Sequence, residues 1–275
     1  MHSLTVARAR WLVLPTVVAL WPAWVRQVRF GLPTFPFGLV LFVLICAYWV
    51  REQRRIEAGQ LGASGFIVAA WLLLAAYALT YDRVPPLGSQ VLATLALGSV
   101  LLSAFPKEIA FRRVAILALF PLTLPLEMAL QFVLGFPFRV LTAGVTAFLL
   151  SPYGVVAHGT RLLYDSRPLE VDAACSGILG LWAFLIVGAV LSLLLQSRWP
   201  RLIVTLAAAT IASLCYNVLR ASLLFMYRFH EGAVSDSLHT LLGAVAFFVS
   251  MMVFALLTIR AYRRPAWSLR KVRPA

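Results

Sequence analysis

The feature that most constrains this chain is a succession of apolar runs, each approaching the length of a membrane-spanning helix, separated by short basic clusters. A spanning α-helix needs about 20 mostly apolar residues. The first and fifth of the runs are short for a span. The sequence therefore predicts an all-α, polytopic membrane bundle of about eight transmembrane helices within a single domain, 1–275. The expected spans are 11–25, 32–50, 62–80, 90–105, 114–128, 175–195, 202–226 and 239–259.

Composition excludes a soluble protein. The 275 residues are 62% hydrophobic and 12% charged, whereas soluble domains are about 45–50% apolar and about 25% charged. The net charge of +14 does not predict a nucleic-acid partner, because the basic residues lie in short clusters between apolar runs. That placement is typical of topology signals in membrane proteins. We therefore expect membrane lipid, and no nucleic acid, around this chain.

The basic clusters predict the orientation of the spans. Six Lys or Arg residues lie in the tail 260–275, which the positive-inside rule places in the cytoplasm. Counting back from there, the loop 196–201 lies inside, and the segments 158–174 and 227–238 lie outside. The clusters at 51–55 and 107–113 lie inside when the count starts from the N-terminus.

Residues 129–157 do not fit this count, since one more crossing would invert every span before them. We expect either a helix lying in the outer interface or a re-entrant hairpin. Breaks are predicted at GlyPhePro (135–137) and at SerProTyrGly (151–154). Non-helical backbone at membrane depth is tolerated only where protein or a wet cavity covers it, so a re-entrant segment would cover a site.

Cys175 lies at the predicted outer start of the sixth span, followed by Ser176 and Gly177. A helix N-terminus favours the thiolate, which is the reactive form of cysteine. The small Ser176 and Gly177 leave backbone N–H groups approachable for an oxyanion. Cys46 and Cys215 fall within spans, where a packing role is expected. Three cysteines without close spacing predict no disulfide scaffold and no metal site, and we expect no cofactor.

Two further residues lie at the same predicted face. Arg220 stands near the outer end of the seventh span, with Asn217 on the same helical face because the spacing is i, i+3. An arginine costs at least about 2.5–3.5 kcal/mol at a helix centre and usually has a partner and a role. Glu127 is one candidate partner, and helix–helix adhesion is the alternative role. His239 begins the eighth span, where it can serve as general base or acid.

The ordered motifs CysSerGly (175–177), AsnValLeuArg (217–220) and HisThrLeuLeuGly (239–243) resemble those of the exosortase/archaeosortase family of membrane transpeptidases. The resemblance is strongest over 158–247 and looser over 114–157. It implies Cys175 as the nucleophile, assisted by Arg220 and His239, and the histidine in third place resembles the bacterial exosortases.

The same resemblance implies the partner and the location. The substrates would be exported proteins with a C-terminal sorting signal such as Pro-Glu-Pro, an apolar helix and basic residues. The enzyme would lie in the bacterial inner membrane, with its site on the periplasmic face.

Three other interpretations remain open. GlyAlaSerGly at 62–65 fits a rhomboid-like serine protease pairing Ser64 with His239, although the predicted topology puts these residues on opposite faces. A transporter or assembly scaffold would use Arg220 and Glu127 to line a polar path, but the chain shows no clear repeat of the kind such folds often have. A metal site would need His158, His230 and His239, and their spacing supports none.

Overall fold

The computed structural model describes residues 35–53, 64–80, 83, 86–124, 126–165, 167–171, 176–231 and 236–263. Most of them are helical, which confirms a helical membrane protein. Among the described residues, the helices long and apolar enough to cross a membrane are Glu127–Leu149, Trp199–Phe229 and Ser237–Arg263. The shorter apolar helices are Val40–Trp49, Gly65–Thr80, Gln90–Ser103 and Ile178–Leu194. The expected span 11–25 lies outside the described residues.

The chain divides into two compact units, one of Met1–Leu126 with Ser192–Ile203, and one of Glu127–Leu191 with Val204–Ala275. In the first unit α4 packs against α3 and α6, and the indole of Trp49 donates a 3.0 Å hydrogen bond to the carbonyl of Leu101. The described helices of this unit are α2 (Phe35–Gln53), α3 (Ser64–Thr80), α4 (Pro86–Ser103), α5 (Lys107–Arg112) and α6 (Ala115–Leu122).

The prediction of a fifth span over 114–128 is wrong. Only Ala115–Leu122 is helical there, and eight residues extend about 12 Å at about 1.5 Å per residue, too little to cross a bilayer. The helix ends at Leu122, and the hydroxyl of the next residue, Thr123, donates to the carbonyl of Phe120 at 2.6 Å. Pro125 also disfavours helical geometry in the residue before it. The apolar run over 114–128 is therefore continuous in the sequence, but the helix within it is not.

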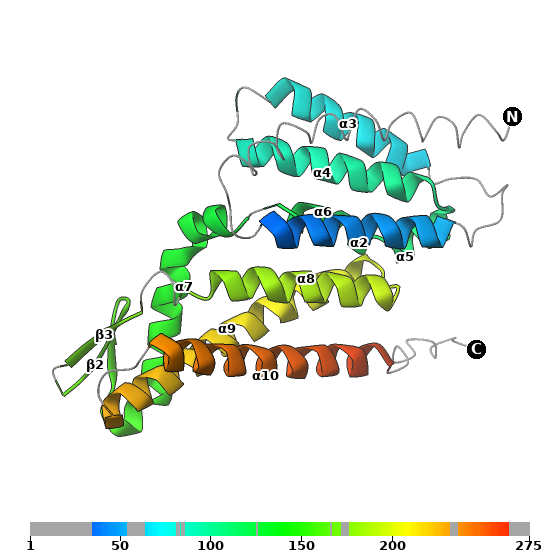
Figure 1. Cartoon of the computed structure of the whole chain (residues 1–275). Coiled ribbons are helices and arrows are strands. Elements are labelled where there is room, and N and C mark those ends of the chain that lie inside the picture. Colours follow the sequence, from blue (N-terminus) through cyan, green and yellow to red (C-terminus); the bar gives the residue numbers. More distant parts are fainter. Residues whose placement is uncertain are drawn as a thin grey trace, which may run out of the picture. The chain divides into compact units, whose positions relative to one another are not determined.

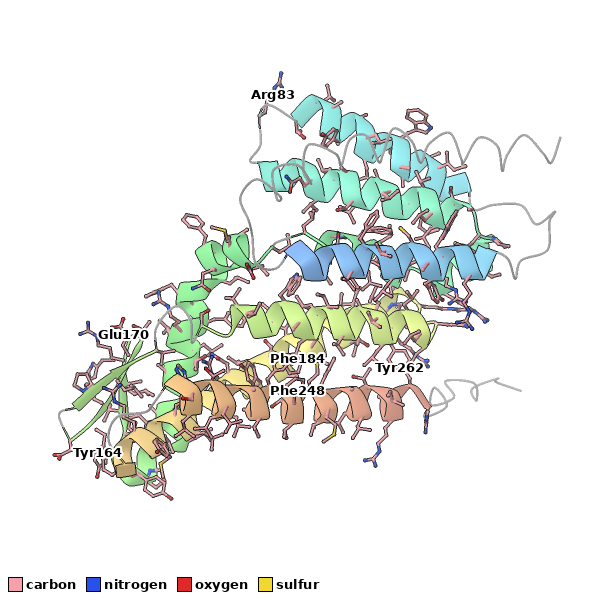
Figure 2. The ribbon with its side chains drawn as sticks, viewed as in Figure 1. Arg83, Tyr164, Glu170, Phe184, Phe248 and Tyr262 are labelled. Carbon is pink, nitrogen blue, oxygen red and sulfur yellow. The ribbon has the colours of Figure 1, made fainter. Side chains whose placement is uncertain are left out.

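In the second unit α8 (Ile178–Leu194), α9 (Trp199–Glu231) and α10 (Asp236–Arg263) share an aromatic core. Phe184 of α8 is fully buried and its ring contacts those of Tyr216 on α9 and Phe254 on α10. Figure 2 shows Phe184 between the ribbons of α8 and α10. Large apolar side chains such as Phe248, 69% exposed, cover the outside of these helices. Such a surface suits contact with lipid.

α7 (Glu127–Leu149) is a continuous helix through Gly135 and Pro137, so the predicted break at 135–137 and the re-entrant hairpin are wrong. A proline removes one backbone hydrogen bond of a helix, a loss that membrane helices tolerate. The predicted stop at 151–154 is confirmed by a 3-10 turn, η1 (Ser151–Tyr153), and by Gly154 at φ 80°. In Figure 1, α7 runs across, not along, α8 and α10.

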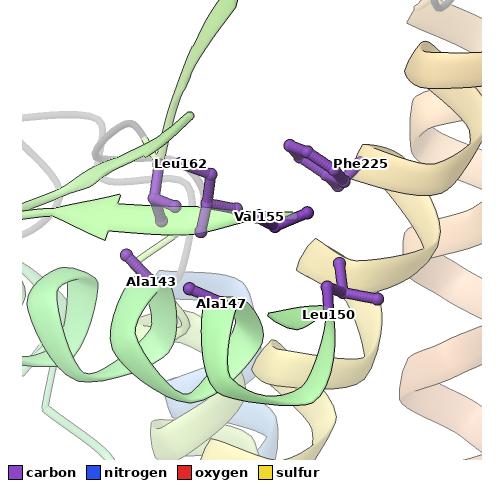
Figure 3. Close-up of a cluster of buried hydrophobic side chains, with 7 residues drawn as sticks. Ala143, Ala147, Leu150, Val155, Leu162 and Phe225 are labelled. Atoms are coloured by element: carbon purple, nitrogen blue, oxygen red, sulfur yellow. The ribbon is translucent and has the colours of Figure 1, made fainter. Parts of the chain in front are cut away.

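After α7 the chain forms a small antiparallel sheet in the order β1-β2-β3, which the all-helical prediction did not include. Its strands are β1 (Val156–His158), β2 (Arg161–Tyr164) and β3 (Arg167–Glu170). Leu162 is fully buried against Ala143 and Ala147 of α7 and Phe225 of α9 (Figure 3). The strands have three or four residues each, too short for an alternating pattern to stand out.

Candidate functional site

Arg220 of α9 and His239 of α10 are in direct contact. The guanidinium Nη2 lies 3.0 Å from Nε2 of the imidazole, and both side chains are half-buried. A guanidinium can only donate hydrogen bonds, so His239 Nε2 is the acceptor and carries no proton in this arrangement. The neutral ring then holds its proton on Nδ1. The structure thus brings together two of the three residues predicted to act in catalysis.

Gly243 explains why the arginine can lie so close to α10. A Cβ atom placed on Gly243 would lie 3.0 Å from Nε of Arg220, closer than ordinary van der Waals contact. Gly243 follows His239 by four residues, so it occupies the same face of α10 one turn further on. In the motif HisThrLeuLeuGly, Gly243 therefore leaves space for the Arg220 guanidinium, which His239 binds.

Cys175 itself lies outside the described residues, but the chain is described on both sides of it. Val171 is buried and its N–H donates to the carbonyl of Thr160 at 2.9 Å. Ser176 is 2% exposed, and its hydroxyl donates to Oε1 of Gln131 on α7 at 2.7 Å. The segment 172–175 is thus bounded by the sheet at one end and by a residue bonded to α7 at the other.

α8 begins at Ile178, three residues later than the predicted start at Cys175. The N–H of Leu181 donates to the carbonyl of Gly177 at 2.8 Å, and the N–H of Ile178 approaches the hydroxyl of Ser176 at 3.4 Å. Gly177 therefore occupies the capping position, with Ser176 one residue before it. The nucleophile candidate therefore precedes the first residue of α8 by three positions.

Asn217 connects Gly177 to the arginine. Its side chain is 1% exposed, and Nδ2 donates to Oγ1 of Thr142 on α7 at 2.8 Å. Gly177 has φ 79°, and a Cβ atom placed on it would lie 2.7 Å from Cγ of Asn217. The loop after Cys175 thus packs on a side chain one helical turn before Arg220.

α7 supplies two site residues that the sequence did not single out, Gln131 and Thr142. Gly135 lets the Gln131 side chain lie flat on the helix, because a Cβ atom at this glycine would come within 2.7 Å of Nε2 of Gln131. A glutamine in an otherwise apolar run was the available signal for this contact. Sequence spacing alone could not show which helix it meets.

The remaining candidates lie elsewhere. Glu127 is in the first turn of α7, where a carboxylate complements the helix dipole. About 22 Å of helix separates it from Thr142 at about 1.5 Å per residue, which favours that role over pairing with Arg220. His158 is exposed on β1, and the side chain of His230 lies outside the described part of the chain.

Within the described ranges, no group of three or more His, Cys, Asp or Glu side chains can hold a metal ion. Cys46 is half-buried in α2, and Cys215 is exposed on α9. Ser64 is the first residue of α3, in the other compact unit from His239.

The fold and this constellation define a polytopic helical membrane protein with an arginine–histidine pair one helical turn from the packing of Gly177 on Asn217. The sequence model of the transmembrane exosortases matches residues 10–256. The chain therefore belongs to the transmembrane exosortase family, which confirms the resemblance seen in its motifs. No curated protein and no solved structure matches the chain.

Proposed function

We propose that the protein is a membrane-embedded cysteine transpeptidase. It cleaves the C-terminal sorting signal of exported proteins and transfers or releases them at the outer face of the bacterial inner membrane. The observation that carries this proposal is the packing of Gly177 on Asn217, one turn before the Arg220 that bonds His239. Family membership supports the reaction class.

The chain itself limits how far the thiol can be from the pair. Cys175 precedes Gly177 by two residues, a separation of at most about 7 Å between their Cα atoms. Arg220 follows Asn217 by one turn, a rise of about 4.5 Å. A long arginine side chain spans such a distance. These distances allow the guanidinium to contact either His239 or the sulfur of Cys175.

In the first step, the Cys175 thiol transfers its proton to Nε2 of His239. Arg220 leaves that nitrogen, because a protonated imidazole no longer accepts, and its guanidinium moves to the thiolate. The thiolate then forms an S–C bond with the carbonyl carbon of the substrate. Arg220 and backbone N–H groups at the start of α8 bind the resulting oxyanion, as preorganised donors do in acyl transfer.

Collapse of that intermediate breaks the C–N bond, and the imidazolium proton passes to the leaving amine. The products are a thioester on Cys175 and the free tail of the substrate. An acceptor amine, a hydroxyl or water next attacks the thioester. It gives a proton back through His239 to the departing sulfur, which restores the thiol. Each step uses the imidazole once as base and once as acid.

The membrane supplies much of the recognition in this proposal. An apolar substrate tail inserts among the helices of the bilayer, so the enzyme and the sorting signal meet in two dimensions at one depth. α7 covers the cysteine-bearing loop, which its bonds to Ser176 and Asn217 support. The basic C-terminal tail is cytoplasmic.

The test is to detect the thioester. Membranes holding the full-length protein and the exported tailed proteins of its host are analysed by intact mass spectrometry, with and without neutral hydroxylamine. We expect an acyl adduct on Cys175 that hydroxylamine releases, and its disappearance in Cys175→Ala. Cys215→Ala is the matched control, because this exposed thiol on α9 should leave the adduct unchanged. Full substrate processing by Cys175→Ala would overturn the proposal.

A further inference from the structure

Arg139 is a half-buried cation that the proposed mechanism does not use. It lies in the middle of α7, and its Nε atom is shielded from solvent without a hydrogen-bond partner among the described residues. Its guanidinium carbon lies 5.8 Å from the centre of the Phe136 ring. This cation–π contact contributes modestly and leaves the planar donor edges of the guanidinium available.

The position of Arg139 on α7 places it near the contact between Gln131 and Ser176. Gln131, Gly135 and Arg139 succeed one another at intervals of four residues, so they lie on neighbouring positions of one helix face. Side chains in a helix lean toward its N-terminus, and the contact with Phe136 shows that Arg139 does so. The guanidinium therefore lies at the level of Gly135, where the Gln131 amide meets the hydroxyl of Ser176.

A half-buried guanidinium whose Nε is shielded from solvent favours an anionic partner. Leaving a charge without a partner in such a place costs free energy that an oppositely charged group offsets. Arginine binds carboxylates through two parallel N–H···O bonds, which fixes the position as well as the charge of the ligand. The ligand must reach Arg139 while the loop holds Cys175.

We propose that Arg139 binds a carboxylate side chain of the substrate's sorting segment, close to the bond that Cys175 attacks. This inference rests on the proposed function and assigns a specificity residue for it. An extended peptide over the loop between α7 and the start of α8 would put an acidic side chain on Arg139. Its backbone would then lie at the oxyanion donors.

A lipid phosphate is the other anion that could bind Arg139 in a membrane. The surroundings of Arg139 favour a carboxylate of the substrate peptide over this phosphate. The exposed side chains of this part of α7 are all apolar, among them Phe132 at 91% and Val133 at 65%. The shielded Nε of Arg139 distinguishes it from an arginine that extends toward a lipid headgroup. Its level on the helix coincides with the Gln131–Ser176 contact, which belongs to the site.

The test uses peptides that alkylate cysteine instead of an unidentified natural substrate. Tetrapeptide acyloxymethyl ketones carry a single Glu, Gln or Lys at each position in turn, with alanine elsewhere. The full-length protein with Cys46→Ala and Cys215→Ala is held in phosphatidylcholine nanodiscs, with or without phosphatidylglycerol. The readout is the second-order rate of Cys175 labelling for the wild-type arginine and for Arg139→Lys, Arg139→Gln and Arg139→Glu. Arg161→Gln is the matched control, since Arg161 is exposed and faces Glu170 at 4.0 Å.

For one position of the peptide, we expect the Glu probe to react at least about tenfold faster than its Gln counterpart, as a charge-assisted pair predicts. Arg139→Gln removes that difference and leaves the Gln rate unchanged within about twofold, because the cation acts on the ligand. Arg139→Lys retains part of the preference, Arg139→Glu shifts it to the Lys probe, and Arg161→Gln keeps it.

Three results would overturn the inference while the proposed function stands. The first is that the Glu and Gln probes label Cys175 at equal rates. The second is that the preference for the Glu probe survives Arg139→Gln. The third is that Arg139→Gln slows labelling by every probe alike, while labelling of the wild type depends on phosphatidylglycerol. The last result would assign Arg139 to lipid phosphate. Failure of every probe to label wild-type Cys175 would overturn the proposed function together with this inference.

Discussion

Gly177 lies directly before the first residue of α8 and two positions after Cys175. Its φ of 79° is a conformation that residues with a side chain rarely adopt, and Asn217 fills the space that a Cβ atom would need. We predict that Gly177→Ala destabilises the fold by about 1–3 kcal/mol from backbone strain alone. The substitution also displaces Asn217 and lowers the rate of Cys175 acylation by at least about tenfold.

Gly159 provides the control for this prediction. It has φ 60° in the turn between β1 and β2, and no atom lies within 4 Å of its hypothetical Cβ. Gly159→Ala should therefore show the backbone cost in a detergent unfolding titration and retain the acylation rate. Equal losses of activity in the two variants would show that the Gly177–Asn217 contact does not position the nucleophile.

Gly243 leads to a second prediction at this scale. A methyl group there would press on Nε of Arg220 from 3.0 Å and shift the guanidinium from His239. We expect Gly243→Ala to lower kcat about three- to tenfold with little change in KM, because displaced catalytic groups act on the transition state. Gly144→Ala on α7, where a Cβ atom meets open space, should match the wild type. A KM effect alone would contradict this role.

The residues whose roles depend on short motifs were the ones that the sequence could indicate. The i, i+3 spacing of Asn217 and Arg220 on one helix and the placement of His239 near the start of the next were visible in the chain. Thr142 and Gln131 were not, because their partners lie 75 and 45 residues away. No local pattern reports which helix crosses which. The role of Cys175 stays a prediction.

Among the elements, α7 is joined to its neighbours by two hydrogen bonds as well as by apolar packing against the sheet and α9. Thr142 bonds Asn217 and Gln131 bonds Ser176, and about 16 Å of helix separates the two anchors at about 1.5 Å per residue. Two widely spaced anchors fix a helix in direction as well as in position. The proposed role of α7 as a cover over Cys175 requires a helix fixed in this way.

Thr142→Val tests the first of these anchors. The valine preserves the shape and removes the acceptor of the Asn217 amide, which should lower the free energy of unfolding by about 1–3 kcal/mol. A double-mutant cycle with Asn217→Ala should give a coupling energy of at least about 0.5 kcal/mol. Thr210→Val, whose hydroxyl bonds only a carbonyl of its own helix, serves as the control for the loss of a hydroxyl. Additive effects of Thr142→Val and Asn217→Ala would contradict the anchor.

The apolar runs of the sequence predicted most helices correctly. They predicted neither the continuity of α7 nor the small sheet. Gly135 and Pro137 suggested a break, yet membrane helices accept proline and the glycine accommodates Gln131. The strands 156–170 escaped detection because tertiary contacts with α7 and α9, and not a repeating pattern, hold them.

For the whole molecule, the topology gives a prediction that does not depend on the chemistry. Asp165→Cys, at the exposed turn between β2 and β3, should react in intact spheroplasts with a membrane-impermeant maleimide. Lys271→Cys should react only after permeabilisation, because the basic tail is expected to be cytoplasmic. Both are made in a background with Cys46, Cys175 and Cys215 replaced by alanine. The opposite labelling pattern would invert the topology.

Membrane class, the family and most helix positions followed from apolar length and motif order, because lipid requires both apolar surface and closed backbone hydrogen bonding. The prediction of the fifth span was wrong because a long apolar run does not guarantee a continuous helix. The prediction of a hairpin over 129–157 was wrong because contacts between residues distant in sequence decide the direction of a helix.

Alkylation of Cys175 in intact spheroplasts tests most directly whether this cysteine faces outward and is activated by Arg220. In the Cys46→Ala/Cys215→Ala background, an impermeant maleimide is applied from pH about 5 to 9. We predict rapid labelling with an apparent pKa below the free-thiol value of about 8.5, rising in Arg220→Ala. Labelling only after the inner face is opened, or a rate indifferent to Arg220, would contradict the account.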